Sequence, residues 1–113
     1  MKRLIFSGII CAVSVLTTIA ADPSAAERYQ REAEYYQRQA ESCQRDAESY
    51  MREAKSHIRE AGYYLRNKNY DRARDYYRKA ANSMDWYETK IKSAERAASN
   101  SEDYLKRAAD ALR

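Results

Sequence analysis

His57, the single histidine, is the side chain of this sequence best suited to acid–base or metal chemistry. Glu53 and Glu60 lie four residues before it and three residues after it, so on a helix the three side chains share one face. Such a set forms a weak site for a divalent cation. The alternative, which we favour, is a seam histidine packed on Tyr77 beside two solvated glutamates.

A catalytic constellation is not visible elsewhere. Cys43 precedes His57 by two heptads, or ~21 Å along a helix, so the thiol and the imidazole of one chain cannot work as a pair. The only glycines are Gly8 and Gly62, which excludes a glycine-rich phosphate loop. We therefore predict a protein that is not an enzyme and that needs no cofactor and no metal.

Residues 1–21 have the pattern of an export signal: two basic residues, an apolar stretch over 4–16 and small residues over 18–21. An uncleaved anchor is the alternative, although the stretch is short for a span of ~20 residues. We expect cleavage, a domain over 22–113, no membrane span after cleavage, and a periplasmic or secreted location. The formal charge of +4 then loses the contributions of Lys2 and Arg3, so the basic pI gives no indication of nucleic-acid binding.

A seven-residue repeat runs without interruption over residues 29–63. One line of the repeat is alanine, and the other is mostly tyrosine. This 3,4 alternation is typical of a coiled-coil seam, with alanine at position a and the larger residue at position d. The a line is Ala33, Ala40, Ala47, Ala54 and Ala61, and the d line is Tyr29, Tyr36, Cys43, Tyr50, His57 and Tyr64.

Turn-forming residues 67–69 interrupt the pattern, and it then resumes in a new register. The resumed seam is expected at Tyr70, Ala73, Tyr77, Ala80, Met84, Tyr87, Ile91, Ala94, Ala98, Leu105, Ala108 and Leu112. We predict an all-α fold in which helices over 24–66 and 70–112 form a coiled-coil-like antiparallel hairpin, with residue i facing residue 134 − i. A short third helix beginning after residues 99–101 is the alternative that we favour less.

Two flanks of this hairpin are candidate partner surfaces. Tyr63, Tyr76 and Trp86 fall outside the predicted seam on an aromatic flank, where covering the helix is the alternative role. On the opposite flank, glutamines give way to apolar residues towards the turn, beyond what a two-helix seam buries. The apolar candidates are Met51, Ile58, Leu65 and Ala81.

Residues 57–85 resemble one tetratricopeptide unit. The matching positions are Ala61, Tyr64, Tyr70, Ala73, Tyr77 and Ala80, together with the sequence Asn-Tyr-Asp-Arg-Ala across the turn. The resemblance implies a two-helix hairpin and a role in binding peptides or proteins.

We therefore expect an exported, non-catalytic helical protein that acts through homo-oligomerisation or by binding a protein partner. A periplasmic holdase-type chaperone using the Met51, Ile58 and Leu65 surface is the first alternative. A weak metal or small-ligand binder around His57 is the second. Cys43, the one cysteine after the signal, is expected either to be buried or to pair between two chains.

Overall fold

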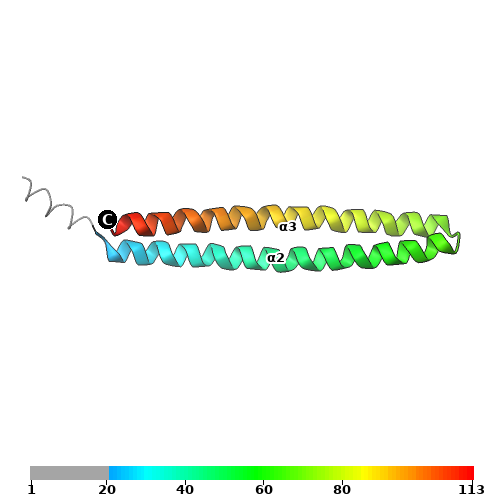
Figure 1. Ribbon diagram of the computed structural model, residues 1–113, viewed down its shortest axis with the longest axis horizontal. Helices are drawn as coiled ribbons and strands as arrows, with labels where there is room; N and C mark the ends of the chain where they lie inside the picture. Colours follow the sequence, from blue (N-terminus) through cyan, green and yellow to red (C-terminus); the bar gives the residue numbers. More distant parts are fainter. Residues whose placement is uncertain (1–20) are drawn as a thin grey trace, which may run out of the picture. The chain divides into compact units, whose positions relative to one another are not determined.

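The computed structural model describes residues 21–113 and contains two long helices, α2 (Pro23–Arg66) and α3 (Tyr70–Ala111). The helices are antiparallel and lie side by side (Figure 1), which confirms the predicted all-α hairpin. The helical bounds differ by one residue at one end of each helix from the expected 24–66 and 70–112. The predicted signal peptide, apart from Ala21, lies outside the described residues.

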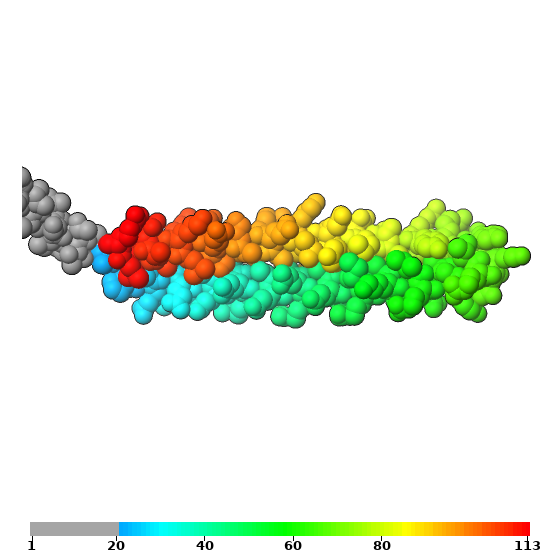
Figure 2. Space-filling model, in the orientation of Figure 1, coloured from blue at the N-terminus to red at the C-terminus, as the bar shows by residue number. Residues whose placement is uncertain are grey.

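The hairpin divides into two compact units. The end unit contains residues 21–36 and Ser99–Arg113, and the turn unit contains Gln37–Ala98. In both units, atoms of α2 abut atoms of α3 on the face seen in Figure 2.

Helix α2 begins with a side-chain cap. The carboxylate Oδ1 of Asp22 accepts a hydrogen bond of 3.0 Å from the backbone N–H of Ala25, and Pro23 occupies the first helical position. An aspartate accepts one of the unpaired N–H groups of the first turn, and proline has no N–H that would be left unpaired there. Asp22 and Pro23 therefore define the start of this helix.

The turn between the helices is closed by backbone hydrogen bonds. Lys68 has a φ of 61°, in the left-handed region, and its N–H donates to Leu65 O at 3.0 Å. The N–H of Asn69 donates to Tyr64 O at 2.9 Å, which completes a Schellman motif and satisfies the last carbonyls of α2. Asn69 Oδ1 then accepts from Arg72 N at 3.4 Å, so the same residue caps the start of α3.

The seam on α2 follows the predicted heptads. The alanines at positions 33, 47, 54 and 61 are at most 1% exposed, and the residues of the d line are half-buried. Every buried residue among those described is alanine or serine, so the interior of the hairpin is made of small side chains. Small residues let two helix backbones approach closely, while the larger d residues fill the sides of the seam.

The seam on α3 differs from the prediction along one of its two lines. The line through Ala73, Ala80 and Ala94 is buried as expected. The second buried line lies three residues after each position of this alanine line, whereas the prediction placed it four residues after. It comprises Tyr76, Ser83, Lys90, Ala97, Tyr104 and Ala111, which are buried or half-buried.

This shift corrects the predicted positions of several large side chains. Tyr70, Tyr77, Leu105 and Leu112 were expected in the seam but are 62%, 44%, 47% and 55% exposed, respectively. Because an α-helix advances ~100° per residue, moving the second line from i+4 to i+3 turns the buried side of α3 by ~50°.

The end unit is held by polar and aromatic contacts between its two helical segments. The hydroxyl of Ser101, which is 4% exposed, donates a hydrogen bond of 3.0 Å to Ala33 O. The Tyr104 ring is stacked on Tyr36 at 5.8 Å between centroids and lies 6.1 Å from Tyr29. Helix α3 continues through residues 99–101 without a break. Ser101 occupies a seam position there, so the polar stretch packs against α2 and does not end the helix.

The two ends of the described chain meet in the same unit, where the N–H of Asp22 donates a hydrogen bond of 2.6 Å to the carbonyl oxygen of Ala111.

Among residues 21–113, no helix is long and apolar enough to cross a membrane.

Candidate functional site

The turn unit has an exposed apolar surface built from one line of each helix. We call it the apolar face, and it comprises Met51, Ile58, Leu65, Tyr70, Tyr77, Ala81, Met84 and Ile91. Three of these side chains, Ile58, Leu65 and Tyr70, are 50%, 47% and 62% exposed, respectively. Residues spaced by seven lie on one side of a helix, so the α2 line 51, 58, 65 and the α3 line 70, 77, 84, 91 each form a continuous stripe.

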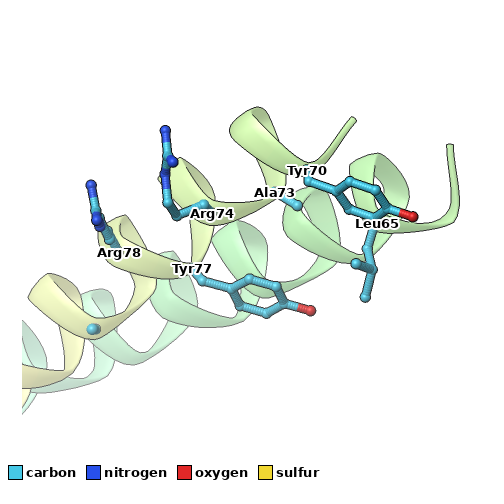
Figure 3. A pocket seen from close by; sticks show the side chains of 7 residues that line it. Leu65, Tyr70, Ala73, Arg74, Tyr77 and Arg78 are labelled. Carbon is cyan, nitrogen blue, oxygen red and sulfur yellow. The ribbon is translucent and has the colours of Figure 1, made fainter. Parts of the chain in front are cut away.

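Leu65 and Tyr77 border an open groove of about 470 Å³ near the turn. Figure 3 shows the rings of Tyr70 and Tyr77 extending to the side on which Leu65 lies, while Arg74 and Arg78 extend away from it. The complete lining is Leu65, Tyr70, Ala73, Arg74, Tyr77, Arg78 and Ala81. Residues of α2 and α3 that are close to the turn in sequence therefore form one apolar surface with a basic edge.

The orientation of α3 leaves its more apolar line incompletely buried. In the turn unit the second line contains the buried Ser83 and the half-buried Lys90, whereas the neighbouring line on the apolar face contains Met84 and Ile91, which are also only half-buried. Full burial of a methionine or isoleucine side chain is worth roughly 1.5–3 kcal/mol relative to exposure, and half-buried side chains gain only part of it, so apolar burial alone favours the opposite orientation. Other contacts must hold α3 in the observed one.

Polar contacts with α2 supply part of that preference. The hydroxyl of Ser83 donates to Glu53 Oε1 at 3.3 Å, and Lys90 Nζ lies 3.6 Å from Asp46 Oδ2. Both acidic residues are on the side of α2 opposite the apolar face, so they draw the polar line of α3 inwards.

Aromatic stacking acts in the same direction. Tyr76 is stacked on Tyr64 with centroids 5.6 Å apart, and it lies 6.0 Å from His57. Trp86 is stacked on Tyr50 at 6.1 Å, although it remains 54% exposed. Offset or stacked aromatic pairs add ~0.5–1.5 kcal/mol beyond area burial.

The predicted aromatic flank is therefore largely engaged within the chain. Tyr76, which was placed outside the seam from the sequence, is a half-buried seam residue, and Lys79 Nζ lies 4.7 Å above its ring. Tyr63 is 53% exposed and contacts Tyr64 edge-on. Trp86 borders a second groove of about 370 Å³ together with Asn82, Asp85 and Thr89.

His57 is half-buried, but the aromatic ring 6.0 Å from it belongs to Tyr76 and not to the predicted Tyr77, which is exposed. Of its two proposed companions, Glu53 accepts the hydrogen bond from Ser83. In the described part of the chain no three histidine, cysteine or acidic side chains converge as metal ligands would. Cys43 is a half-buried free thiol.

Charged residues border the apolar face on both helices. On α3 the row next to the exposed apolar line reads Arg74, Ala81, Glu88 and Glu95, and on α2 the corresponding row includes Glu48 and Lys55. Arg74 lies 3.6 Å from Asp71 and 3.7 Å from Asp75 in exposed ion pairs. Such pairs are weak and readily exchanged, because solvent screens them.

The structure thus brings the predicted partner residues Met51, Ile58, Leu65 and Ala81 to one face, and it adds four residues from α3 to them. Tyr70, Tyr77, Met84 and Ile91 were assigned to the seam from the sequence, where they satisfy a heptad spacing equally well. A signal for the correct line was present in the sequence. The line that begins at Tyr76 also contains Tyr104, and these two tyrosines can stack on Tyr64 and Tyr36 of the tyrosine line of α2.

Comparison with protein-family models, with curated proteins and with solved structures finds no match to this chain. The resemblance to a single tetratricopeptide unit accordingly stays a prediction from residue spacing.

Proposed function

We propose that this protein is an exported, non-catalytic interaction protein that binds another protein surface through the apolar face. The observation that carries the proposal is the orientation of α3. Tyr70 and Tyr77 on its apolar line are exposed, while Ser83 is buried and donates a hydrogen bond to Glu53 of α2. A contiguous exposed apolar surface rimmed by charges marks a protein interaction site more often than it marks ordinary surface.

The interior of the hairpin supports the same proposal. Its buried residues are alanines and serines, and no large side chain among those described is fully buried. Each alanine removes little apolar area from water, and the hydrophobic contribution scales with that area. Covering the apolar face by a partner supplies burial that the hairpin seam lacks.

Photo-crosslinking in the cell that makes the protein tests this role. A benzoylphenylalanine is placed at Ile58 or Tyr77 in the full chain, and the matched control carries it at Asn82, which is exposed on the outer side of α3. We expect protein adducts from the two face positions and far fewer from Asn82. Equal yields from all three positions, or adducts from none of them, would contradict the proposal.

A holdase-type chaperone is the second candidate, because the groove beside Leu65 and Tyr77 is open and apolar. In this role the apolar face would bind exposed apolar segments of many unfolded proteins, whereas in the first role it binds the surface of one folded protein. Suppression of aggregation of a reduced test protein, abolished by Ile58→Glu and retained by Asn82→Glu, would favour it. A stable dimer that buries the face would count against it.

A further inference from the structure

We infer that the turn end of the hairpin binds the anionic surface of a lipid bilayer. We call this end the basic tip, and it comprises residues 63–79. The inference goes beyond the proposed function, in which the apolar face binds a protein. Three observations carry it: the concentration of positive charge in the basic tip, the exposed rings among those charges, and the presence of the charges on both flanks of the turn.

Positive charge is concentrated in the basic tip. Residues 63–79 contain six basic and two acidic side chains, a net charge of +4, whereas the rest of residues 22–113 contains thirteen and fifteen, a net charge of −2. Both acidic side chains of the tip, Asp71 and Asp75, pair with Arg74. An anionic partner is therefore complementary to this end of the protein. The other five basic side chains are exposed and have no acidic partner within residues 63–79: Arg66, Lys68, Arg72, Arg78 and Lys79.

The heptads of α2 show where the excess of positive charge begins. An arginine recurs every seven residues from Arg31 to Arg66. Each of the four arginines over residues 31–52 has a glutamate four positions before it, whereas Arg59 has Lys55 there and Arg66 has Gly62. Side chains four residues apart are neighbours on a helix surface. The helix is thus balanced in charge far from the turn and basic close to it.

Exposed apolar side chains lie among these charges. Tyr63, Leu65, Tyr70 and Tyr77 are 53%, 47%, 62% and 44% exposed, respectively. Tyrosine is favoured at the boundary between headgroups and acyl chains, where its ring leaves water and its hydroxyl stays hydrated. Arginine and lysine extend their aliphatic stems over apolar surface and keep their charged ends at the headgroups. This combination of side chains suits a surface that lies on a bilayer without spanning it.

The position of the charges distinguishes a bilayer from other anionic partners. On one flank Arg72 lies over the Tyr64 ring, 5.4 Å from its centroid. On the other flank Arg74 and Arg78 border the groove and extend away from the side on which its apolar residues lie (Figure 3). Lys68 lies in the turn between them. An acidic protein or a nucleic-acid backbone that approaches from one side meets part of this set, whereas a planar surface met by the turn end-on faces both flanks.

The basic tip overlaps the apolar face only near the turn, so both surfaces can be occupied at once. Leu65, Tyr70 and Tyr77 belong to both. The bilayer leaves the remainder of the apolar face for a protein partner, namely Met51, Ile58, Met84 and Ile91.

Co-sedimentation with lipid vesicles tests the inference on the protein purified from the cell that makes it. Vesicles of two parts phosphatidylcholine to one part phosphatidylglycerol should bind it. Vesicles of phosphatidylcholine alone should bind on the order of 100-fold more weakly, because each lysine or arginine near an anionic surface strengthens binding by about fivefold. Raising the salt from ~50 to ~500 mM should release the protein, because it shortens the range of the attraction.

Two variants of equal charge locate the contact. Arg66→Gln with Lys68→Gln removes two unpaired charges from the basic tip and should weaken binding to the anionic vesicles on the order of 20-fold. Arg38→Gln with Arg45→Gln removes two exposed charges from the same helix far from the turn, and it should weaken binding by less than about threefold. Both variants should keep the helical circular dichroism of the native protein.

Tryptophan emission tests the end-on orientation. Trp86, the one tryptophan, lies outside the basic tip, so its emission in the native protein should not shift when anionic vesicles are added. Tyr70→Trp in a Trp86→Phe background moves the reporter into the tip, and its emission should shift to the blue as the ring leaves water. A shift for Trp86 and none for Tyr70→Trp overturns the inference.

The remaining outcomes separate this inference from its alternatives. Equal binding to the two kinds of vesicle, or equal weakening in the two double variants, overturns it. Poly-glutamate that binds the protein as tightly as the anionic vesicles do would identify an acidic polypeptide as the partner and also overturn it. If the vesicles fail to bind while Ile58 crosslinks to other proteins in the cell, the proposed function stands alone. If they bind and no adducts form, only the proposed function fails.

Discussion

The hydroxyl of Ser101 donates a hydrogen bond to the carbonyl oxygen of Ala33 inside the end unit, at a distance of 3.0 Å. A polar residue thus takes a seam position at which an alanine would also fit, and it links α2 to α3 where the sequence suggests a break at residues 99–101. We expect Ser101→Ala to lower the free energy of unfolding by about 0.5–1.5 kcal/mol, because one buried hydrogen bond is lost.

A larger substitution at the same position should have a larger effect. Ser101→Val replaces the hydroxyl by a methyl group and adds a second methyl group where the helices meet, and overpacking of this kind costs about 1–3 kcal/mol. Urea unfolding followed by circular dichroism measures both changes at one fixed protein concentration. Ser99→Val, at an exposed position of the same turn, is the control, and equal stability of the two valine variants would show that residue 101 is not in the seam.

The stacked rings of Tyr36 and Tyr104 should contribute a measurable coupling energy. A double-mutant cycle with Tyr36→Ala and Tyr104→Ala should give about 0.5–1.5 kcal/mol, since the centroids are 5.8 Å apart and the rings are inclined by only 10°. The cycle of Tyr35 with Tyr104 is the control, because Tyr35 contacts Tyr36 and not Tyr104. Similar coupling in both cycles would argue against the observed stack.

The alanine layers should not tolerate larger residues. Ala54 is 1% exposed, so Ala54→Leu forces the helices apart and should lower the free energy of unfolding by about 1–3 kcal/mol. Ser56→Leu, two residues away and exposed, should change it by less than about 0.5 kcal/mol. Thermal unfolding of the two variants distinguishes the buried position from the exposed one, and a neutral Ala54→Leu would mean that no close seam exists there.

The left-handed residue of the turn offers a stabilising substitution. Lys68 has a φ of 61°, a conformation that is unfavourable for a residue with a Cβ by about 1–2 kcal/mol and is accessible to glycine without this penalty. Glycine relieves this strain, but it also gives the unfolded chain more conformational entropy, which cancels part of the gain. We therefore expect Lys68→Gly to raise the free energy of unfolding by up to about 1 kcal/mol.

The same change within a helix should act in the opposite direction. Lys55→Gly should lower the free energy of unfolding by about 1 kcal/mol, since glycine is a poor helix former. Chemical denaturation compares the two, and destabilisation by Lys68→Gly would be inconsistent with the observed turn.

Periodicity within one helix was enough to predict α2. Its alanine and tyrosine lines have no competitor, because the remaining positions over residues 27–50 are charged or polar apart from Tyr35. The turn at residues 67–69 was likewise visible as a local residue preference. The predicted alanine layers pair residue i with residue 134 − i, and the contact of Ala33 with Ser101 has this sum.

The second line of α3 could not be chosen from periodicity, because two lines satisfy the heptad. Tyr77 and Tyr76 are adjacent in sequence, and the line of Tyr77 is the more apolar, so the sequence favours it. The choice is made by contacts between helices, such as Lys90 with Asp46 and the Tyr64 stack on Tyr76. As a result, the exposed Tyr70 and Tyr77 were misplaced into the seam.

The small side chains of the seam also govern how the fold responds to heat. Unfolding raises the heat capacity in proportion to the apolar area that becomes hydrated, at ~0.45 cal/K/mol per Å². Layers of alanine and serine expose little such area, so a hairpin without its partner should have a shallow stability curve and a broad, weakly cooperative melting transition. A sharp calorimetric peak would then indicate that a partner covers the apolar face, because the isolated hairpin is expected to give a broad one.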